Sequence, residues 1–325
     1  MATTRPDTGG MDDVAASFDK IRANIERVIE GKTEVVRLAL IALLAEGHLL
    51  IEDVPGVGKT MLAKALARSI DCSVRRIQFT PDLLPSDVTG VSVFNQERGD
   101  FEFKPGAIFA NIVLGDEINR ASPKTQAALL ESMEERQVTM DGVTYQLGVP
   151  FMVIATQNPI EQGGTYPLPE AQLDRFLMKT SLGHPDHEAM VALLRDAARR
   201  DRAADVRAVM PAENLAPLSR LADYVTVRPE VLGYVSELAS ATHRHKHMKL
   251  GVSARGCLAY VRCAKTWALS QGRTAVTPDD IRMLAKPILG HRVLINEEAV
   301  FDGVTVDGVL SEVFYQVPVP LVRAA

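Results

Sequence analysis

Cysteine is scarce in this chain of 325 residues. The three that occur, Cys72, Cys257 and Cys263, are odd in number and lack the spacing of a metal site. Neither a disulfide scaffold nor a cysteine-based metal centre fits this pattern. We therefore expect reduced thiols that pack as small hydrophobic side chains in an intracellular protein.

Long apolar runs are also missing. No stretch runs long enough without charge to span a bilayer, and residues 1–13 are polar and acidic with no apolar signal segment. We expect a cytoplasmic protein without membrane insertion, and a disordered N-terminus over residues 1–13.

Positive charge is not in excess. The 36 Lys and Arg residues stand against 41 Asp and Glu, which gives a net charge of −5. Nothing in this balance attracts the whole chain to a polyanion, so we expect no nucleic-acid partner.

What the chain does contain is an alternation of short apolar runs and helical patterns. With 46% hydrophobic and 24% charged residues, its length suffices for two domains. Apolar runs that predict strands lie at 48–52, 74–79, 112–114, 151–155 and 176–178. Alternation of this kind predicts a parallel sheet covered by helices over residues 14–183. From about residue 184 the strands stop and helical stretches dominate, so residues 184–325 are expected to form an all-helical second domain.

Two segments depart from this alternation and predict β-hairpin insertions. The first pairs residues 91–93 with 101–103 across a polar turn. The second places Asp141 and Gly142, a strong two-residue turn signal, between residues 138–140 and 143–145.

A glycine loop between the first predicted strand and a helix has the composition of a phosphate-binding loop. Its core is Gly56, Val57, Gly58, Lys59 and Thr60, but the first glycine of the strict pattern is replaced by Asp53. Backbone amides at a helix N-terminus attract phosphate, Lys59 would reach the β- and γ-phosphates, and the Thr60 hydroxyl would bind Mg²⁺. The segment taken alone also fits a Pro- and Gly-rich turn before a helix.

Two adjacent acids, Asp116 and Glu117, end the strand that begins at residue 112. Asp116 could support a Mg²⁺ ion, and Glu117 could orient or deprotonate an attacking water. The alternative interpretation is an acidic pair that faces solvent at a strand end. Lys59 and Thr60 precede the pair in the order that a nucleotide site requires, which disfavours this alternative.

Four segments together resemble the MoxR family of AAA+ ATPases, in the helix-2-insert branch of that superfamily. They cover residues 52–60, 116–121, 155–159 and 168–176, and the match runs from about residue 15 to the C-terminus. Asp53 is a familiar variation in that family. The resemblance implies an α/β P-loop NTPase core with a five-stranded parallel sheet, and a small all-α lid domain. It also implies ATP and Mg²⁺ as cofactors, with ATP held by Pro55, Gly56, Val57, Gly58, Lys59, Thr60 and Met61, and metal held by Thr60 and Asp116.

The resemblance assigns further roles that spacing alone does not. Asn158 matches the sensor 1 position, Arg175 the arginine finger that reaches a neighbouring subunit's nucleotide, and Arg255 the sensor 2 position of the lid. From the residues alone, Asn158 before a proline fits a turn, and Asp174 with Arg175 fits a surface ion pair. Family members usually carry Pro at position 254, so the Ala found there leaves the start of that helix less fixed.

The two hairpins match the helix-2 insert and the pre-sensor-1 insert of this branch. In related rings the first insert lies near the central pore. Phe101, Phe103 and Lys104 are therefore candidates for contact with a client protein, although packing on the domain accounts for them equally well.

The resemblance implies an ATPase in a ring, hexameric in this family, that remodels or matures other proteins. The clients in the family often receive a metal cofactor or carry a von Willebrand A domain, which this chain lacks. Two other classes fit less well: a DNA-dependent motor, which the acidic balance disfavours, and a nucleotide-gated scaffold that binds ATP without hydrolysing it.

Overall fold

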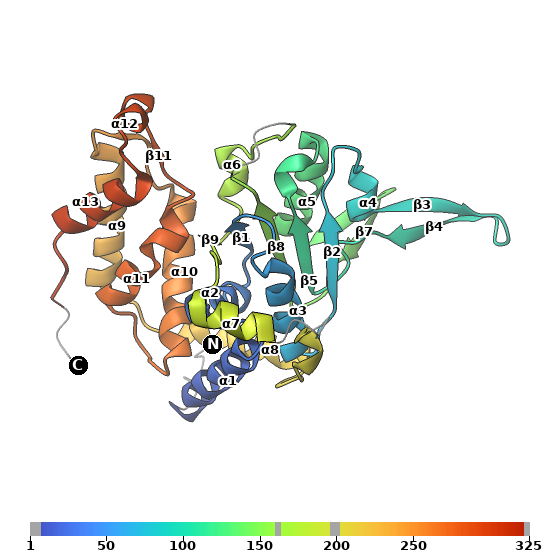
Figure 1. Ribbon diagram of the computed structural model, residues 1–325, viewed down its shortest axis with the longest axis horizontal. Coiled ribbons are helices and arrows are strands. Elements are labelled where there is room, and N and C mark those ends of the chain that lie inside the picture. Colours follow the sequence, from blue (N-terminus) through green and yellow to red (C-terminus); the bar gives the residue numbers. More distant parts are fainter. Residues whose placement is uncertain (1–7, 160–163, 196–201, 322–325) are drawn as a thin grey trace, which may run out of the picture. The chain divides into compact units, whose positions relative to one another are not determined.

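A computed structural model describes residues 8–159, 164–195 and 202–321 (Figure 1). The first part of the chain contains helices α1 (Thr8–Glu26), α2 (Thr33–Leu44), α3 (Lys59–Ser69), α4 (Pro85–Thr89), α5 (Pro123–Glu135), α6 (Glu170–Leu173) and α7 (His187–Arg195). Its strands are β1 (Leu49–Glu52), β2 (Val74–Gln78), β3 (Gly90–Asn95), β4 (Asp100–Pro105), β5 (Ile112–Asp116), β6 (Gln137–Met140), β7 (Val143–Gln146), β8 (Met152–Gln157) and β9 (Met178–Thr180).

The remaining elements are mostly helical. They are α8 (Leu215–Arg220), α9 (Pro229–Arg244), α10 (Ala254–Ser270), α11 (Pro278–Leu289), α12 (Glu297–Phe301) and α13 (Val306–Gln316), with short strands β10 (Met248–Leu250) and β11 (Leu294–Ile295). The two short strands pair antiparallel, which the expectation of an all-helical second domain did not include. None of the helices in the described ranges is both long and apolar enough to cross a membrane.

The chain forms two compact units. The sheet unit comprises Lys20–Phe176 and Thr180–Ala216, and the helical unit comprises Met1–Asp19, Leu177–Lys179 and Pro217–Ala325. The later division therefore falls at residues 216–217, further along the chain than the expected 183–184.

The N-terminal expectation is corrected by helix α1. Residues 8–13, expected to be disordered, form the start of this helix. Met11, Val14 and Phe18 are buried, and their spacing continues one apolar stripe into the polar segment. A few buried side chains at helical spacing are enough to hold a segment whose composition is polar.

The central sheet has five strands in the order β2-β5-β8-β1-β9, and the pairs β2–β5, β5–β8 and β1–β8 are parallel. This confirms the predicted five-stranded core. All five residues of β5 are buried, as are five of the six in β8, because these strands lie inside the sheet. Edge strand β2 has an exposed face that carries polar side chains.

Both predicted hairpins are present. β3 pairs with β4, and β6 pairs with β7 across Asp141 and Gly142, which both have positive φ as the turn type requires. Figure 1 shows the β3–β4 hairpin projecting from the sheet unit. The rings of Phe103 in β4 and Tyr145 in β7 stack with their centroids 4.0 Å apart, so this contact joins the two insertions.

Candidate functional site

The glycine loop lies between β1 and α3 and is open on one side. Gly56 and Gly58 have φ angles of 89° and 104°, a region that side-chain-bearing residues rarely occupy, and Gly58 is the N-cap of α3. A Cβ added at Gly56 would meet no atom within 4 Å. Within the described ranges, the amides of Gly56, Val57 and Gly58 donate to no other backbone group. Amides so arranged at a helix N-terminus suit an anion.

Lys59 is buried within this loop. Its Nζ donates to the carbonyl oxygens of Asp53 at 2.9 Å and Val54 at 3.3 Å. The ammonium therefore lies against the first residues of the loop, and neighbouring Thr60 is only partly covered.

Asp53, the residue that breaks the strict loop pattern, has a structural role. Its Oδ1 accepts a hydrogen bond from the Val54 amide at 3.0 Å, and its Oδ2 accepts from the Ser181 hydroxyl at 3.0 Å and the Gly183 amide at 2.7 Å. The side chain is buried. Asp53 thus ties the loop to the segment that follows β9, a connection that glycine could not make.

Asp116 ends β5, directly beside the end of β2. Its Oδ1 accepts from the Thr156 hydroxyl at 2.6 Å, and its Oδ2 is paired with the Arg76 guanidinium at 2.7 Å. The Thr156 hydroxyl also accepts from the amide of Glu117 at 2.9 Å. A threonine on β8 therefore holds the side chain of Asp116 and the backbone of Glu117, which directly follows β5.

Glu117 has a left-handed backbone conformation with φ of 58°. Its Oε2 accepts from Gln78 Nε2 at 2.9 Å and is paired with the Arg120 guanidinium at 3.1 Å. The carboxylate is held at the end of the sheet by residues of β2 and of the turn after β5.

Two expected site residues of the sheet unit remain, Asn158 and Arg175. Asn158 directly follows β8, and in the parallel register its strand lies between β5 and β1, so it shares the carboxyl edge of the sheet with Asp116 and the glycine loop. Arg175, by contrast, is paired with Glu134 of α5 at 3.1 Å. The sequence pointed to Asp174 as a partner for Arg175, whereas this ion pair is formed with a residue of α5.

Arg255 belongs to the helical unit, at the second position of α10. The helix begins at Ala254 although the family's proline is missing, because Ser253 caps it by accepting from the Gly256 amide at 3.0 Å. The Arg255 side chain is exposed.

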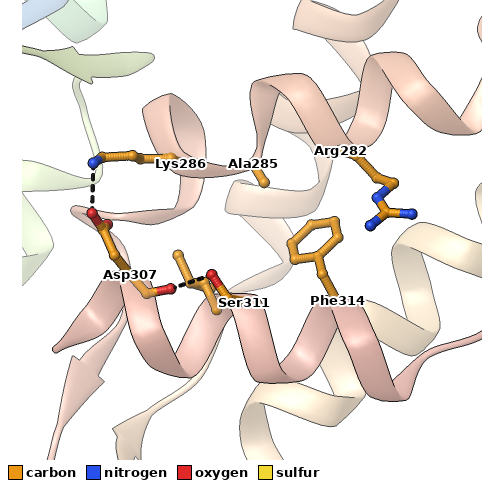
Figure 2. A pocket seen from close by; sticks show the side chains of 7 residues that line it. Arg282, Ala285, Lys286, Asp307, Ser311 and Phe314 are labelled. Atoms are coloured by element: carbon orange, nitrogen blue, oxygen red, sulfur yellow. Dashed lines mark hydrogen bonds and ion pairs between the residues drawn. The ribbon is translucent and has the colours of Figure 1, made fainter. Parts of the chain in front are cut away.

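The helical unit also contains a cavity of about 370 Å³ between α11 and α13 (Figure 2). Lys286 and Asp307 form an ion pair at one end of it at 2.5 Å, and Phe314 and Leu310 supply apolar walls. None of the residues expected from the sequence to hold nucleotide lines this cavity.

Sequence reasoning missed four side chains that contact the acid pair: Arg76, Gln78, Arg120 and Thr156. A signal for two of them was present, since Arg76 and Gln78 alternate on a strand and therefore share one face. Two polar residues at this spacing on a predicted strand could have indicated a polar site beside that strand.

The fold and this arrangement define a class. A parallel five-stranded sheet, a glycine loop before a helix with a buried lysine, and an Asp-Glu pair on a nearby strand are the features of a P-loop ATPase of the AAA+ type. The model of the AAA family, ATPases associated with various cellular activities, matches residues 48–178, and that of the AAA lid domain matches residues 240–313.

Individual relatives narrow the class to a family. The chain is 36% identical to Chaperone MoxR1 of Mycobacterium tuberculosis, over 97% of this chain and 86% of that protein. It is 48% identical to the uncharacterized protein YeaC of Bacillus subtilis, over 97% and 98% of the two chains. The structure of a candidate ATPase from Cytophaga hutchinsonii superposes with a TM-score of 0.90 at 36% identity, covering 96% of this chain and 98% of that one. The chain belongs to the MoxR family of AAA+ ATPases.

Proposed function

We propose that this protein binds ATP with Mg²⁺ and hydrolyses it. The observation that carries the proposal is the shared carboxyl edge of the sheet, where the glycine loop, Lys59, Asp116 and Glu117 all lie in one unit. In open parallel sheets this edge is where ligands bind.

The donor set fits both cofactors. The free amides of residues 56–58 and the Lys59 ammonium suit phosphate oxygens, with Pro55 and Met61 flanking them. The oxygens of Asp116 and Thr60 are the ligand type that Mg²⁺ prefers. When bound, Mg²⁺ would neutralise charge developing on the transferred phosphoryl group.

The protein's own side chains divide the remaining work. Glu117 would accept a proton from the attacking water or orient it, and Asn158 would hold that water or the γ-phosphate. Arg175 and Arg255 would stabilise the charge that develops on the γ-phosphate, Arg175 from a neighbouring subunit.

The decisive test is Glu117→Gln. This variant keeps the size of the side chain and one oxygen that can accept from Gln78 or Arg120 but removes the base, so ATP binding should persist while turnover falls about 10²- to 10⁴-fold. Calorimetry gives the binding and phosphate release gives the turnover. Glu131→Gln, at an exposed position of α5, is the matched control and should keep full activity.

If wild-type protein turned over ATP no faster than Glu117→Gln, hydrolysis would be ruled out. ATP binding in both proteins would then favour the nucleotide-gated scaffold. A DNA-dependent motor would instead show turnover that rises on addition of DNA and falls with salt.

We further propose that hydrolysis drives the remodelling or maturation of a separate client protein in the cytoplasm, with a von Willebrand A protein or a metal-receiving enzyme as the candidate clients. The name of the Mycobacterium tuberculosis relative, Chaperone MoxR1, supports a chaperone-like role. Assembly is proposed as a hexameric ring, because Arg175 as a finger requires a neighbour. Retention of a specific protein by Glu117→Gln in ATP, and its release in ADP, would identify the client.

The β3–β4 hairpin is the proposed contact with the client. Phe101 is 71% exposed and meets the half-exposed Phe94 edge to face, with ring centroids 5.4 Å apart. Lys104 is exposed as well, whereas Phe103 packs against Phe109 and Tyr145. Of the three expected contact residues, only Phe101 and Lys104 are therefore available.

A further inference from the structure

Arg76 is the one cation that contacts the carboxylate of Asp116 within the residues that the structure describes. Its Nη2 and Nε lie 2.7 Å and 3.2 Å from the same oxygen, Oδ2. The other oxygen, Oδ1, is engaged by the buried Thr156 hydroxyl. Both oxygens of the proposed metal-supporting acid therefore have protein partners.

The geometry makes Arg76 and a metal ion competitors. A divalent cation supported by Asp116 needs the lone pairs and the negative charge that the guanidinium now uses, and two cations so close repel each other. Thr156, a neutral donor, is no obstacle of this kind. The Arg76 side chain is 52% exposed, so solvent is open to it once it leaves Asp116.

Arg76 also links the two acids. Its Nη2 donates to Gln78 Oε1 at 2.5 Å, and Gln78 Nε2 donates to Glu117 Oε2 at 2.9 Å. Because Arg76 and Gln78 are two residues apart on β2, their side chains lie on the same face of the strand. Departure of Arg76 from Asp116 would remove the contact that orients Gln78 toward Glu117.

We propose that Arg76 is a positioning residue that holds Asp116 while no metal is bound and yields it when Mg²⁺ enters with the nucleotide. This inference rests on the proposed ATP and Mg²⁺ site. In this role Arg76 sets how tightly the site binds metal. Through its contact with Gln78, it also makes the position of the Glu117 side chain depend on whether metal is bound.

The test measures metal binding directly. Electron paramagnetic resonance of free Mn²⁺, titrated into protein with a non-hydrolysable ATP analogue, gives the metal affinity of the wild type and of Arg76→Gln. Removing the competitor should tighten Mn²⁺ binding by up to about fivefold, the upper limit for losing one partly exposed ion pair. Analogue binding without metal should stay unchanged, and a side chain with a purely structural role would not tighten metal binding when removed.

Arg75→Gln is the matched control. It removes the same charge from the preceding residue of β2, whose Nη1 donates to the Gly106 carbonyl at 3.1 Å instead of to Asp116. Its Mn²⁺ affinity should equal that of the wild type. Arg76→Lys keeps a positive charge without the two-pronged contact and should fall between the wild type and Arg76→Gln.

Two results would overturn the inference. Equal or weaker Mn²⁺ binding by Arg76→Gln, with the wild type binding normally, would show that Arg76 does not compete with metal and would leave the proposed function intact. An absence of nucleotide-dependent Mn²⁺ binding in every protein would instead remove the proposed site and this inference with it.

Discussion

At the scale of single residues, Asp53 replaces the first glycine of the strict loop pattern and connects the loop to the segment after β9. Its buried carboxylate accepts three hydrogen bonds, two of them from residues 181 and 183. Sequence spacing alone shows only that a glycine is missing. The partners lie more than a hundred residues away along the chain, so only the folded chain reveals why an acid is there.

The first prediction concerns this carboxylate. Asp53→Ala leaves the Ser181 hydroxyl and the Gly183 amide without their acceptor and should destabilise the protein by about 2–4 kcal/mol. Asp53→Asn retains one acceptor oxygen and should lose less. Thermal unfolding measures both, with Asp82→Asn at an exposed site as the control. An unchanged Tm for Asp53→Ala would contradict the structural role.

A second residue-scale prediction concerns the thiols. Burial, helped by the charge of Asp71, raises the pKa of Cys72 to about 12, and burial raises the pKa of Cys263 to about 12 against the opposing influence of Arg262 and Arg292. Burial also raises the pKa of Cys257. Since thiolate is the reactive form, a raised pKa makes it scarce at neutral pH and more abundant as pH rises.

Labelling of the folded protein with a disulfide reagent should therefore be slow at pH 7 and accelerate steadily toward pH 10. The unfolded protein provides the control, because all three thiols then return to an ordinary pKa and should react within minutes. Fast labelling of Cys72 or Cys263 in the native protein at pH 7 would count against burial as the cause.

At the scale of elements, the local patterns were reliable wherever short-range chemistry sets the boundary. Helix α5 begins at Pro123 after Ser122, whose hydroxyl caps it by accepting from the Thr125 amide at 3.3 Å, so neighbouring residues set its start. The turn at Asp141 and Gly142 was predicted for the same reason. The start of α1 and the strands β10 and β11 were missed, because distant packing and pairing stabilise them.

A third prediction tests the base of the β3–β4 hairpin. A Cβ at Gly90, where φ is 107°, would lie 2.5 Å from the Lys104 carbonyl oxygen and 2.8 Å from the Gly106 amide. Gly90→Ala should therefore destabilise the hairpin by about 1–3 kcal/mol, through strain and overlap with backbone that cannot move aside. Faster amide exchange over residues 90–105 reports the effect.

The control is a glycine that has neither a positive φ nor a close backbone neighbour. Gly233 lies inside α9, where an added Cβ meets nothing within 4 Å, so Gly233→Ala should stabilise the protein by about 0.5–1 kcal/mol. Unchanged exchange in Gly90→Ala would show that the hairpin base tolerates a side chain and that the close approach is incidental.

At the scale of the whole molecule, the proposed finger role of Arg175 bears on whether one chain contains the complete site. In the single chain its guanidinium is paired with Glu134 at 3.1 Å, at partial exposure of both side chains. An ion pair of this kind contributes little stability, so it does not explain the arginine by itself. It would also be easily exchanged for a phosphate on a neighbouring subunit.

The last prediction follows from that exchange. Arg175→Ala alone should lose about 10³-fold or more in turnover, as expected for a finger supplied in trans, while still binding ATP. Mixing it with Glu117→Gln should restore part of the activity, because an Arg175→Ala subunit keeps Glu117 and its neighbour supplies Arg175. Phosphate release from each protein and from the mixture measures this.

Arg220→Ala, at an exposed position at the end of α8, is the control and should be fully active alone. Light scattering would show whether the mixtures form rings. If they do and activity does not recover, Arg175 acts within its own subunit, or not at all.

The sequence by itself determined the class of protein and most of its elements, because glycine loops, caps, tight turns and apolar periodicity act over a few residues. It also supplied Lys59, Asp116 and Glu117 as candidates in the right order along the chain. Only the tertiary structure decided what holds the three acids Asp53, Asp116 and Glu117. Ser181 contacts Asp53, Thr156 and Arg76 contact Asp116, and Gln78 contacts Glu117. These contacts form between strands, or residues that directly follow them, that are adjacent in the sheet but far apart in sequence. No local pattern records which side chains strand pairing will bring together.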